Sequence, residues 1–490
     1  MNRLFVFSVI VLFLYLLTVR GRWGVPSVEE IDFRLNSSGK PFETSQERSR
    51  YAIILSLVND RSVSIDNYAS MGTPDIGKIN GHYYSFFPPT ISLMAIPFYL
   101  LGIQIGAAQI TTFLISTVFA VLTGLVIYKF GRKLGWTQAV AFFSWMVFAF
   151  ATNAWGYSVT FYAHLVSAFF LISATYVVIF NEDNSWRKSL VFWLIYGIAV
   201  WVDYPNVFSF LPLAVMNLSK LFLVANFVDG YKLKINLAHL FTPIIFITFL
   251  VGYGYYNYQL FGHPLRLSNA IPRVRDLKVV QNVSPEVEKK ALGILQTRNL
   301  LEGLRSFTLS HDRGVLVYSP IMILAALGLI YFSRRRSHVG VVLLLIAANN
   351  LLLYSMFGDP YGGWSFGSRY MIAVVPQLAI LIGAGLVEFR KKLLVKLIYS
   401  VVFTISVAIS LLSPLTTNVI APFVEARNLG LDSWFIINWR MLINNELNSF
   451  VYNYLLGGNV SGLSYYLATL LLVLVVGLTL IWKSHSQKNI

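Results

Sequence analysis

Apolar segments long enough to cross a lipid bilayer follow one another along almost the whole chain. A spanning helix needs about 20 apolar residues, or about 17 at the shortest. Candidate segments lie at residues 4–19, 90–106, 107–128, 137–152, 164–180, 189–203, 206–224, 238–256, 314–332, 339–356, 371–388, 397–413 and 464–482. Open-ended segments in lipid must be helices, because only a helix satisfies its own backbone hydrogen bonds there. We therefore expect an all-α, polytopic integral membrane protein with about 12–13 transmembrane helices.

The composition supports this fold class and excludes others. Charged residues make up only 12% of the 490 residues, against about 25% in soluble domains. This excludes a soluble enzyme, a disordered chain and a nucleic-acid-binding module. The 38 basic and 22 acidic residues leave a net charge of +16, which predicts contact with anionic lipid on the cytoplasmic side rather than with nucleic acid. The absence of Cys excludes disulfides and thiolate chemistry.

Basic clusters predict the orientation of the spans, because cytoplasmic loops carry an excess of Lys and Arg. The clusters lie at residues 129–133, 187–188, 220–234, 334–336, 390–396 and 483–488. With these in the cytoplasm, the outer loops are 20–88, 153–163, 203–205, 257–312, 357–370 and 414–462. The alternation fails only near 90–128, where two full spans would place 129–133 outside. A re-entrant or interfacial segment at 90–106, which contains Pro97, would restore the alternation; the alternative is that the few positive charges at 129–133 lie outside.

The first outer segment, residues 20–88, holds eight of the 22 acids. It follows an apolar run, Leu4–Val19, that has no small-residue cleavage site after it and is expected to stay as an anchor. Tyr51–Val58 is too short to span and predicts an amphipathic helix on the membrane surface. No soluble domain is evident, so the chain is predicted to form one integral membrane domain over residues 1–490.

The segment Gln46–Ala52 carries the first candidate for chemistry. Glu47 and Arg50 are three residues apart, so a helix places them on one face. A carboxylate at the bilayer surface can be partly desolvated, which raises its pKa and suits it to act as a general base. The alternative is a solvated surface ion pair.

Three further candidates lie in or beside outer loops. The segment Asn80–Pro89 contains His82, Tyr83 and Tyr84, and it suits either phosphate binding or an aromatic turn at the membrane interface. His164 begins an apolar segment at its outer end, where it is either functional or a hydrogen-bonded packing residue. Asp203 also lies at an outer helix end and needs a partner, such as an Arg elsewhere.

Two late segments bring arginines together with glycines and aromatics. The first, Ser310–Pro320, contains Arg313. The second, Gly358–Tyr370, contains four glycines, Trp364 and Arg369. Glycines let backbone N–H groups approach a ligand, Trp364 can stack on a sugar or an isoprenoid, and an Arg can hold a phosphate through two hydrogen bonds. The alternative is a structural turn with Arg369 reaching to lipid headgroups.

Motifs of several other enzyme and transport classes are absent from the sequence. There is no Gly-rich loop ending in Gly-Lys-Ser/Thr, no His-Glu-x-x-His and no Gly-x-Ser-x-Gly. Few charges lie within the spans, which argues against an ion-coupled transporter.

The order of these motifs resembles the GT-C type of membrane glycosyltransferase, above all the protein O-mannosyltransferase and lipid A aminoarabinose transferase group. That group has Asp-Glu-x-Arg-Tyr-Ala and later Asn-Gly-x-x-Tyr-Phe-x-Lys-Pro-Pro. Here Arg50-Tyr51-Ala52 and Asn80–Pro89 follow the same order, and Tyr128–Gly135 resembles the group's basic turn. Gly314–Pro320 and Gly362–Tyr370 resemble a bacterial branch of the group. The resemblance covers about residues 1–380.

The resemblance implies that Glu47 stands at the place of the catalytic carboxylate. It further implies a polyprenyl-phosphate-linked sugar donor, a cell-envelope acceptor and an active site on the non-cytoplasmic face of the plasma (inner) membrane. The chain departs from the pattern in three places: Glu replaces Asp at 47, Phe87 stands where the group has Lys, and His164 replaces an acid. Arg369 is expected to replace the missing phosphate contact.

No cofactor is expected, and a metal site of several acids is not supported. The predicted roles are Glu47 as base, with substrate or phosphate contacts from Arg50, His82, Tyr83, Tyr84, His164, Asp203, Arg313, Trp364 and Arg369. Two alternatives remain open at this point: a flippase or other transporter of lipid-linked oligosaccharides, and an enzyme like the O-antigen ligases or polymerases. The second would use a large late outer loop such as 257–312.

Overall fold

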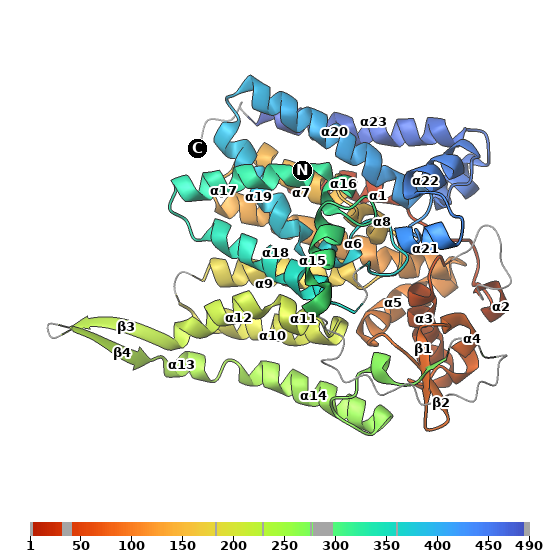
Figure 1. Ribbon diagram of the computed structural model, residues 1–490, viewed down its shortest axis with the longest axis horizontal. Coiled ribbons are helices and arrows are strands. Elements are labelled where there is room, and N and C mark those ends of the chain that lie inside the picture. The colour runs from red at the N-terminus through yellow and green to blue at the C-terminus, as the bar shows by residue number, and fades with distance from the viewer. Residues whose placement is uncertain are drawn as a thin grey trace.

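The computed structural model describes residues 3–31, 42–181, 184–227, 230–274, 277, 297–358 and 361–484. Its long apolar helices run roughly parallel in one bundle (Figure 1). They are α1 (Arg3–Leu16), α6 (Ala108–Lys133), α7 (Gln138–Phe150), α9 (His164–Ile179), α10 (Trp186–Val202), α12 (Leu211–Leu218), α14 (Ile244–Phe261), α17 (Ala325–Arg334), α18 (Val339–Ser355), α19 (Val375–Phe389), α20 (Leu393–Leu415) and α23 (Gly462–Lys483).

The remaining helices and strands connect the helices of the bundle or lie at its ends. They are α2 (Val28–Ile31), α3 (Ser45–Leu55), α4 (Ala69–Gly72), β1 (Ile76–Ile79), β2 (His82–Ser85), α5 (Thr90–Gln104), α8 (Ala154–Ser158), α11 (Asn206–Ser209), β3 (Phe222–Phe227), β4 (Gly230–Ile235), α13 (Leu237–Leu240), β5 (Arg273–Val274), α15 (Leu300–Thr308), α16 (Val315–Tyr318), α21 (Phe423–Asn428) and α22 (Trp434–Ile443). The expected all-α polytopic architecture is confirmed. Within the described part, five helices are long and apolar enough to cross a membrane by length and composition.

The predicted basic clusters meet at one end of the bundle, which we call the basic end. At this end, contacts join residues that are far apart in the sequence. They are Arg3 with Gln138, Phe130 with Phe180, Trp136 with Tyr331, Arg334 and Arg335 with Glu388, and Lys396 with Trp482. The β3–β4 hairpin extends from this end (Figure 1).

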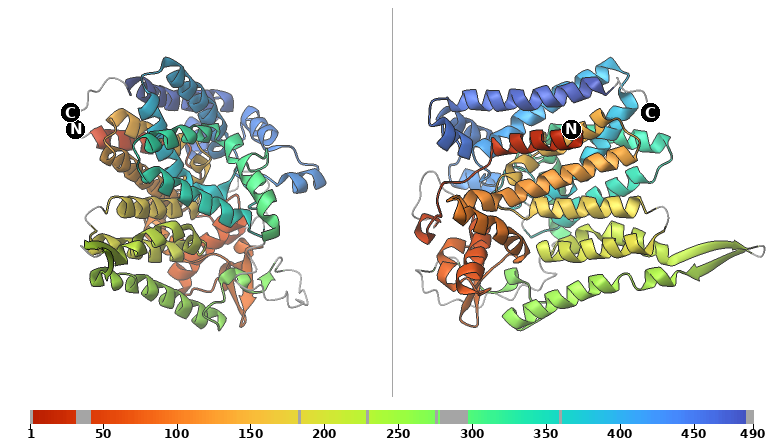
Figure 2. Two further views of the ribbon diagram at one scale, coloured as in Figure 1. Left: turned by 60° about the vertical axis from the view of Figure 1, so that its left-hand side comes forward. Right: turned by 180° about the vertical axis from the view of Figure 1, so that it is seen from behind.

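The opposite end, which we call the loop-rich end, gathers the predicted outer segments. It carries α3, α4 and the β1–β2 hairpin on one side and α21 with α22 on the other (Figure 2, right). The end of α1, the first predicted outer segment and the late segment 413–448 are tied together there by hydrogen bonds. The segregation of loops expected from the charge pattern is therefore present, although positions 275–276, 278–296 and 359–360 lie outside the described residues.

Helix α5 explains why the alternation of charge failed near residue 100. Its first turn lies at the loop-rich end, where the Thr90 hydroxyl donates to the carbonyl of Trp201 (2.6 Å). The turn after it lies at the same end, because the N–H of Gly24 donates to the carbonyl of Gly106 (2.7 Å). Since α6 then runs to the basic end, the segment 90–106 does not cross the bundle, which matches the predicted repair.

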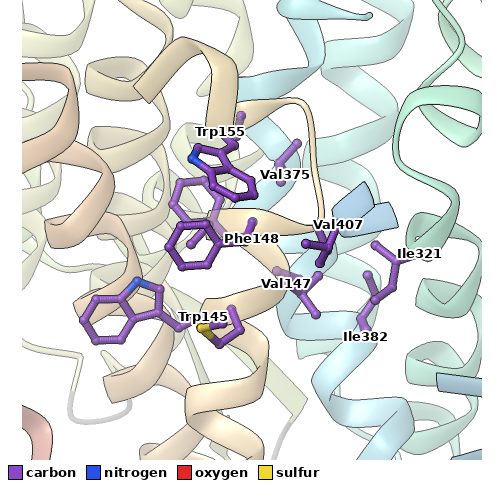
Figure 3. Packing of buried hydrophobic residues seen from close by; sticks show 14 of the residues in the cluster. Trp145, Val147, Phe148, Trp155, Ile321, Val375, Ile382 and Val407 are labelled. Atoms are coloured by element: carbon purple, nitrogen blue, oxygen red, sulfur yellow. The ribbon is translucent and has the colours of Figure 1, made fainter. Parts of the chain in front are cut away.

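The core of the bundle centres on α7, whose residues from Val140 to Phe150 are all buried. Figure 3 shows Trp145, Val147 and Phe148 of this helix packed toward side chains of α19 and α20. Gly124 of α6 permits the close approach of α7, because a Cβ there would lie 1.7 Å from Trp145 Nε1. Aromatic and branched side chains thus fill the centre of the bundle.

Helix α3 lies inside the protein. Each of its residues from Glu47 to Leu55 is buried, so it is covered by protein and does not lie on a free membrane surface as the sequence suggested. The β1–β2 hairpin beside it was not expected either. Its two-residue turn is Asn80-Gly81, with φ of 52° and 88°, and Asn-Gly is the strongest short signal for a tight hairpin.

Candidate active site

Glu47 is fixed at the start of α3 by a capping box. The Thr44 side chain accepts from the N–H of Glu47. In return, Glu47 Oε2 accepts from the N–H groups of Glu43 (3.0 Å) and Thr44 (3.1 Å). The Oε1 atom has one long contact, with the N–H of Phe161 at 3.4 Å. The carboxyl group is therefore held rigidly, and Oε1 keeps most of its capacity to accept a proton.

Burial controls the charge state of this carboxyl group. Only 1% of Glu47 is exposed. Burial, followed by the negative charge of Glu43, raises the pKa of Glu47 to about 7, against the opposing effects of Arg20 and the backbone N–H groups. A base whose pKa lies near the working pH is well suited to take and release a proton.

Glu43 and Arg20 form a buried ion pair beside Glu47, with side chains 11% and 3% exposed. Glu43 also accepts from the N–H of Asn418 (3.0 Å) and from the Asn448 side chain (3.2 Å). Arg20 in turn donates to carbonyl groups near the end of α20, among them that of Pro414 (3.2 Å). This pair therefore joins the end of α1, the approach to α3 and the late outer segment into one support for the site.

Arg369 reaches the residue next to Glu47. With the Gln46 amide oriented so that its oxygen faces Arg369, that oxygen accepts from Nη1 (2.6 Å) and Nη2 (2.9 Å). Tyr162 lies between the two groups: its hydroxyl contacts that of Thr44 at 2.9 Å. Burial and the charge of Glu47 raise the pKa of Tyr162 well above its usual value, and the charge of Arg369 opposes this. Arg369 and Glu47 therefore belong to one site.

Arg50 and Asp203 complete the charged groups of this site. Arg50 is 4% exposed, and its guanidinium lies 4.1 Å from the centre of the Phe87 ring. Burial lowers the pKa of Arg50 to about 10, and the charge of Asp203 opposes the shift. Burial raises the pKa of Asp203 to about 6, against the charges of Arg50 and Arg369. The charges of both arginines thus favour the ionised form of Asp203, although no described ion pair joins Asp203 directly to either of them.

Three nitrogen atoms in this region are buried and have no hydrogen-bond partner among the described residues. They are Arg50 Nε, Arg369 Nε and His164 Nε2. The His164 ring stacks on Tyr162 with centroids 5.9 Å apart. Buried polar atoms in native proteins are nearly always satisfied, so unused nitrogens from three separate segments indicate a place for an acceptor-rich ligand.

Arg313 has a different position from the one predicted. It is 0% exposed, and its guanidinium donates to the carbonyls of Tyr361 (2.8 Å), Gly363 (2.8 Å) and Ile420 (2.9 Å) as well as to Asp312. These bonds use all five of its N–H groups. The predicted substrate contact of Arg313 therefore does not fit the structure, and this residue instead holds the glycine-rich segment that leads to Arg369.

That glycine-rich segment depends on backbone freedom. Gly367 has a φ of +67°, and a Cβ there would lie 2.9 Å from the Tyr318 ring. Trp364 is 37% exposed and donates to Glu425 at 2.6 Å, so it is bound to α21.

Among the described contacts, none joins the β1–β2 hairpin to the charged side chains of Glu47, Arg50, Asp203 and Arg369. The side chain of His82 is 57% exposed and pairs with Asp66 at 2.7 Å. Tyr83 lies under Lys78, and Tyr84 packs on Phe261. The site also contains four residues that were not predicted from the sequence: Arg20, Glu43, Gln46 and Tyr162. Thr44-x-x-Glu47 was a readable capping-box signal, whereas no local pattern links Arg20 to Glu43.

Within the described part of the chain, no group of three or more His, Asp or Glu side chains is arranged to hold a metal ion. No protein-family model matches the sequence. No curated protein matches it either.

Solved structures resemble the fold. The structure of ArnT from Cupriavidus metallidurans bound to undecaprenyl phosphate superposes with a TM-score of 0.52 at 14% identity, covering 98% of this chain and 76% of the other. An oligosaccharyltransferase of Archaeoglobus fulgidus, in complex with Zn and sulfate, gives a TM-score of 0.44 at 14% identity over 87% of this chain and 54% of the other. The chain has a GT-C-like fold.

Proposed function

We propose that this multi-pass membrane protein is a glycosyltransferase that moves a sugar from a polyprenyl-phosphate donor to a cell-envelope acceptor. The acceptor is a glycolipid, a glycan or a protein. The reaction takes place at the loop-rich end, on the non-cytoplasmic side of the plasma membrane.

One observation carries this proposal. A buried carboxyl group with a pKa of about 7 lies in the same site as two buried arginines that have unused N–H groups. The carboxyl group suits removal of a proton from an acceptor hydroxyl. The arginines suit a leaving phosphate, because guanidinium groups match phosphate oxygens through paired hydrogen bonds. A general base and a phosphate site together describe sugar transfer from a phosphate donor.

The proposed step is a displacement at the anomeric carbon. Glu47 Oε1 takes the proton of the acceptor hydroxyl as the acceptor oxygen forms its bond to the anomeric carbon. The bond from that carbon to the phosphate oxygen breaks, and the polyprenyl phosphate leaves with the electron pair. Arg369 and Arg50 stabilise the charge that develops on the phosphate. Such a displacement inverts the configuration of the sugar.

The likeness to ArnT supports the donor class, since that protein was crystallised with undecaprenyl phosphate, a polyprenyl phosphate. A transport function has less support. The amides of Asn349 and Asn350 within α18 bond to Phe208, Ser209 and Tyr370, so these polar groups serve helix packing.

The test compares the surface glycans of cells with and without the chain by mass spectrometry. We expect loss of one sugar substituent on deletion, its return with the wild type, and no return with Glu47→Gln. Glu446→Gln makes the same chemical change at an exposed position of the loop-rich end and is expected to restore the substituent. An unchanged glycan profile on deletion would contradict the proposal.

A further inference from the structure

A second candidate site lies at the loop-rich end, and Glu47 is not among its lining residues. It is a groove of about 1310 Å³ between α15 with the turn that follows it and α21 with α22. These helices lie on the same side of the molecule (Figure 2, left). Small-molecule pockets usually measure about 300–1,000 Å³, so this groove suits a larger ligand. None of Glu47, Arg50 and Arg369 lines it.

The groove has unpaired positive charge. Each acid in its lining has a partner: Glu302 bonds to the Tyr361 hydroxyl, Asp312 to Arg313, and Asp432 to Arg440. By contrast, Arg305 and Arg427 also line the groove, and neither has an ion pair or a side-chain hydrogen bond within the described part of the chain. Glu302 keeps its negative charge because its partner is an uncharged hydroxyl, so Arg305 and Arg427 leave a net charge of +1 in the groove, which complements an anion.

A buried hydroxyl in the groove gives independent evidence of a ligand. Ser306 lies one position after Arg305 on α15 and is only 3% exposed. Its Oγ has no hydrogen-bond partner among the described residues, although it lines the groove. A buried hydroxyl left without a partner costs stability, and an oxygen-rich ligand would remove that cost.

Exposed apolar side chains form the rest of the groove wall. Leu309 is 66% exposed, Phe423 67% and Phe435 51%, and all three line the groove. Such a concentration of apolar surface beside cations matches an amphiphile, with its charged head on the arginines and its chain along the apolar wall. A free phosphate or a sugar would leave that wall uncovered.

From these observations we propose that the groove between α15 and α21–α22 binds the head group of an anionic membrane phospholipid. The site is separate from sugar transfer and does not depend on the proposed function. It is mechanically connected to the other site, because Arg313 bonds to Tyr361 and Ile420, which line the groove, and to Gly363, which leads toward Arg369. A bound lipid thus rests against the segment that positions Arg369.

Native mass spectrometry of the full chain in dodecyl maltoside tests this proposal. The probes are phosphatidylglycerol and phosphatidylcholine with the same acyl chains. Two arginines near an anionic head should favour phosphatidylglycerol by roughly tenfold or more. Arg305→Gln with Arg427→Gln should abolish that preference and leave phosphatidylcholine binding unchanged.

Two further variants separate the site from general effects. Arg61→Gln with Lys78→Gln removes the same charge from the loop-rich end outside the groove and should keep the preference. Arg305→Lys with Arg427→Lys keeps the charge and should retain most of it, which also guards against loss through misfolding. Equal binding of the two lipids by the wild type would overturn the proposal, as would an unchanged preference in the double Gln variant.

Discussion

Glu47→Gln tests the central chemical claim, because Gln keeps the shape of the side chain and removes its basicity. General base catalysis contributes about 10²–10⁴-fold, which corresponds to about 2.7–5.4 kcal/mol of barrier. Turnover is measured as polyprenyl phosphate released from the donor that the glycan analysis identifies. We expect the variant to keep less than about a hundredth of wild-type turnover.

The pH profile gives the same test a second readout. The pKa of Glu47 is raised to about 7, and the base must be deprotonated to act. Activity is therefore lost as the pH falls through 7, by about tenfold for each further pH unit. An ordinary glutamate would keep the wild-type rate down to about pH 4.3. The residual activity of Glu47→Gln should not show this fall near pH 7, because the variant has no carboxyl group there to titrate.

Glu47 also caps α3, so the loss of the cap must be separated from the loss of the base. Thr44→Ala removes the hydroxyl partner of the capping box and keeps the carboxyl group. It should cost about 1 kcal/mol of stability and leave turnover within about tenfold of the wild type. Retention of more than about a tenth of turnover by Glu47→Gln would refute the role of Glu47.

Three further predictions concern the surrounding structure. Arg369→Lys keeps the charge but loses the planar pair of donors, so KM for the donor should rise by about tenfold while KM for the acceptor changes little; equal effects on both would contradict the phosphate role. Arg20→Met leaves Glu43 buried without its partner and should cost about 3–5 kcal/mol, seen as a lower Tm, whereas adding Glu43→Gln should recover part of the loss. Single Cys residues at 334–336 in this Cys-free chain should resist an impermeant label applied outside the cell, and Cys at 62 should react; labelling at 334–336 would reverse the proposed orientation.

The sequence by itself determined the class of fold and the ends of the bundle. In lipid, the only hydrogen-bond partner of a backbone group is another backbone group. The thirteen apolar segments were therefore expected to form helices or short interfacial segments. The basic clusters then separated the two ends, because lysine and arginine avoid translocation. The irregular segment 90–106 was also identifiable, because a segment that does not cross the membrane there makes the charge alternation consistent. Glu47 was singled out by its neighbours in the chain and by resemblance, both of which are local signals.

Only the tertiary structure decided which residues meet Glu47. Arg20, Glu43 and Gln46 lie in one N-terminal stretch, but their partners Pro414, Asn418, Asn448 and Arg369 come from the last quarter of the chain. Local periodicity carries no information on such pairings, because helices in a bundle can pack in many orders with the same apolar faces. For the same reason, the sequence could not show that Arg313 donates all its N–H groups to a loop, whereas the Nε atoms of Arg50 and Arg369 have no partner among the described residues. Whether an arginine binds a substrate or a carbonyl depends on the geometry of the surrounding backbone, and that geometry exists only once the bundle has packed.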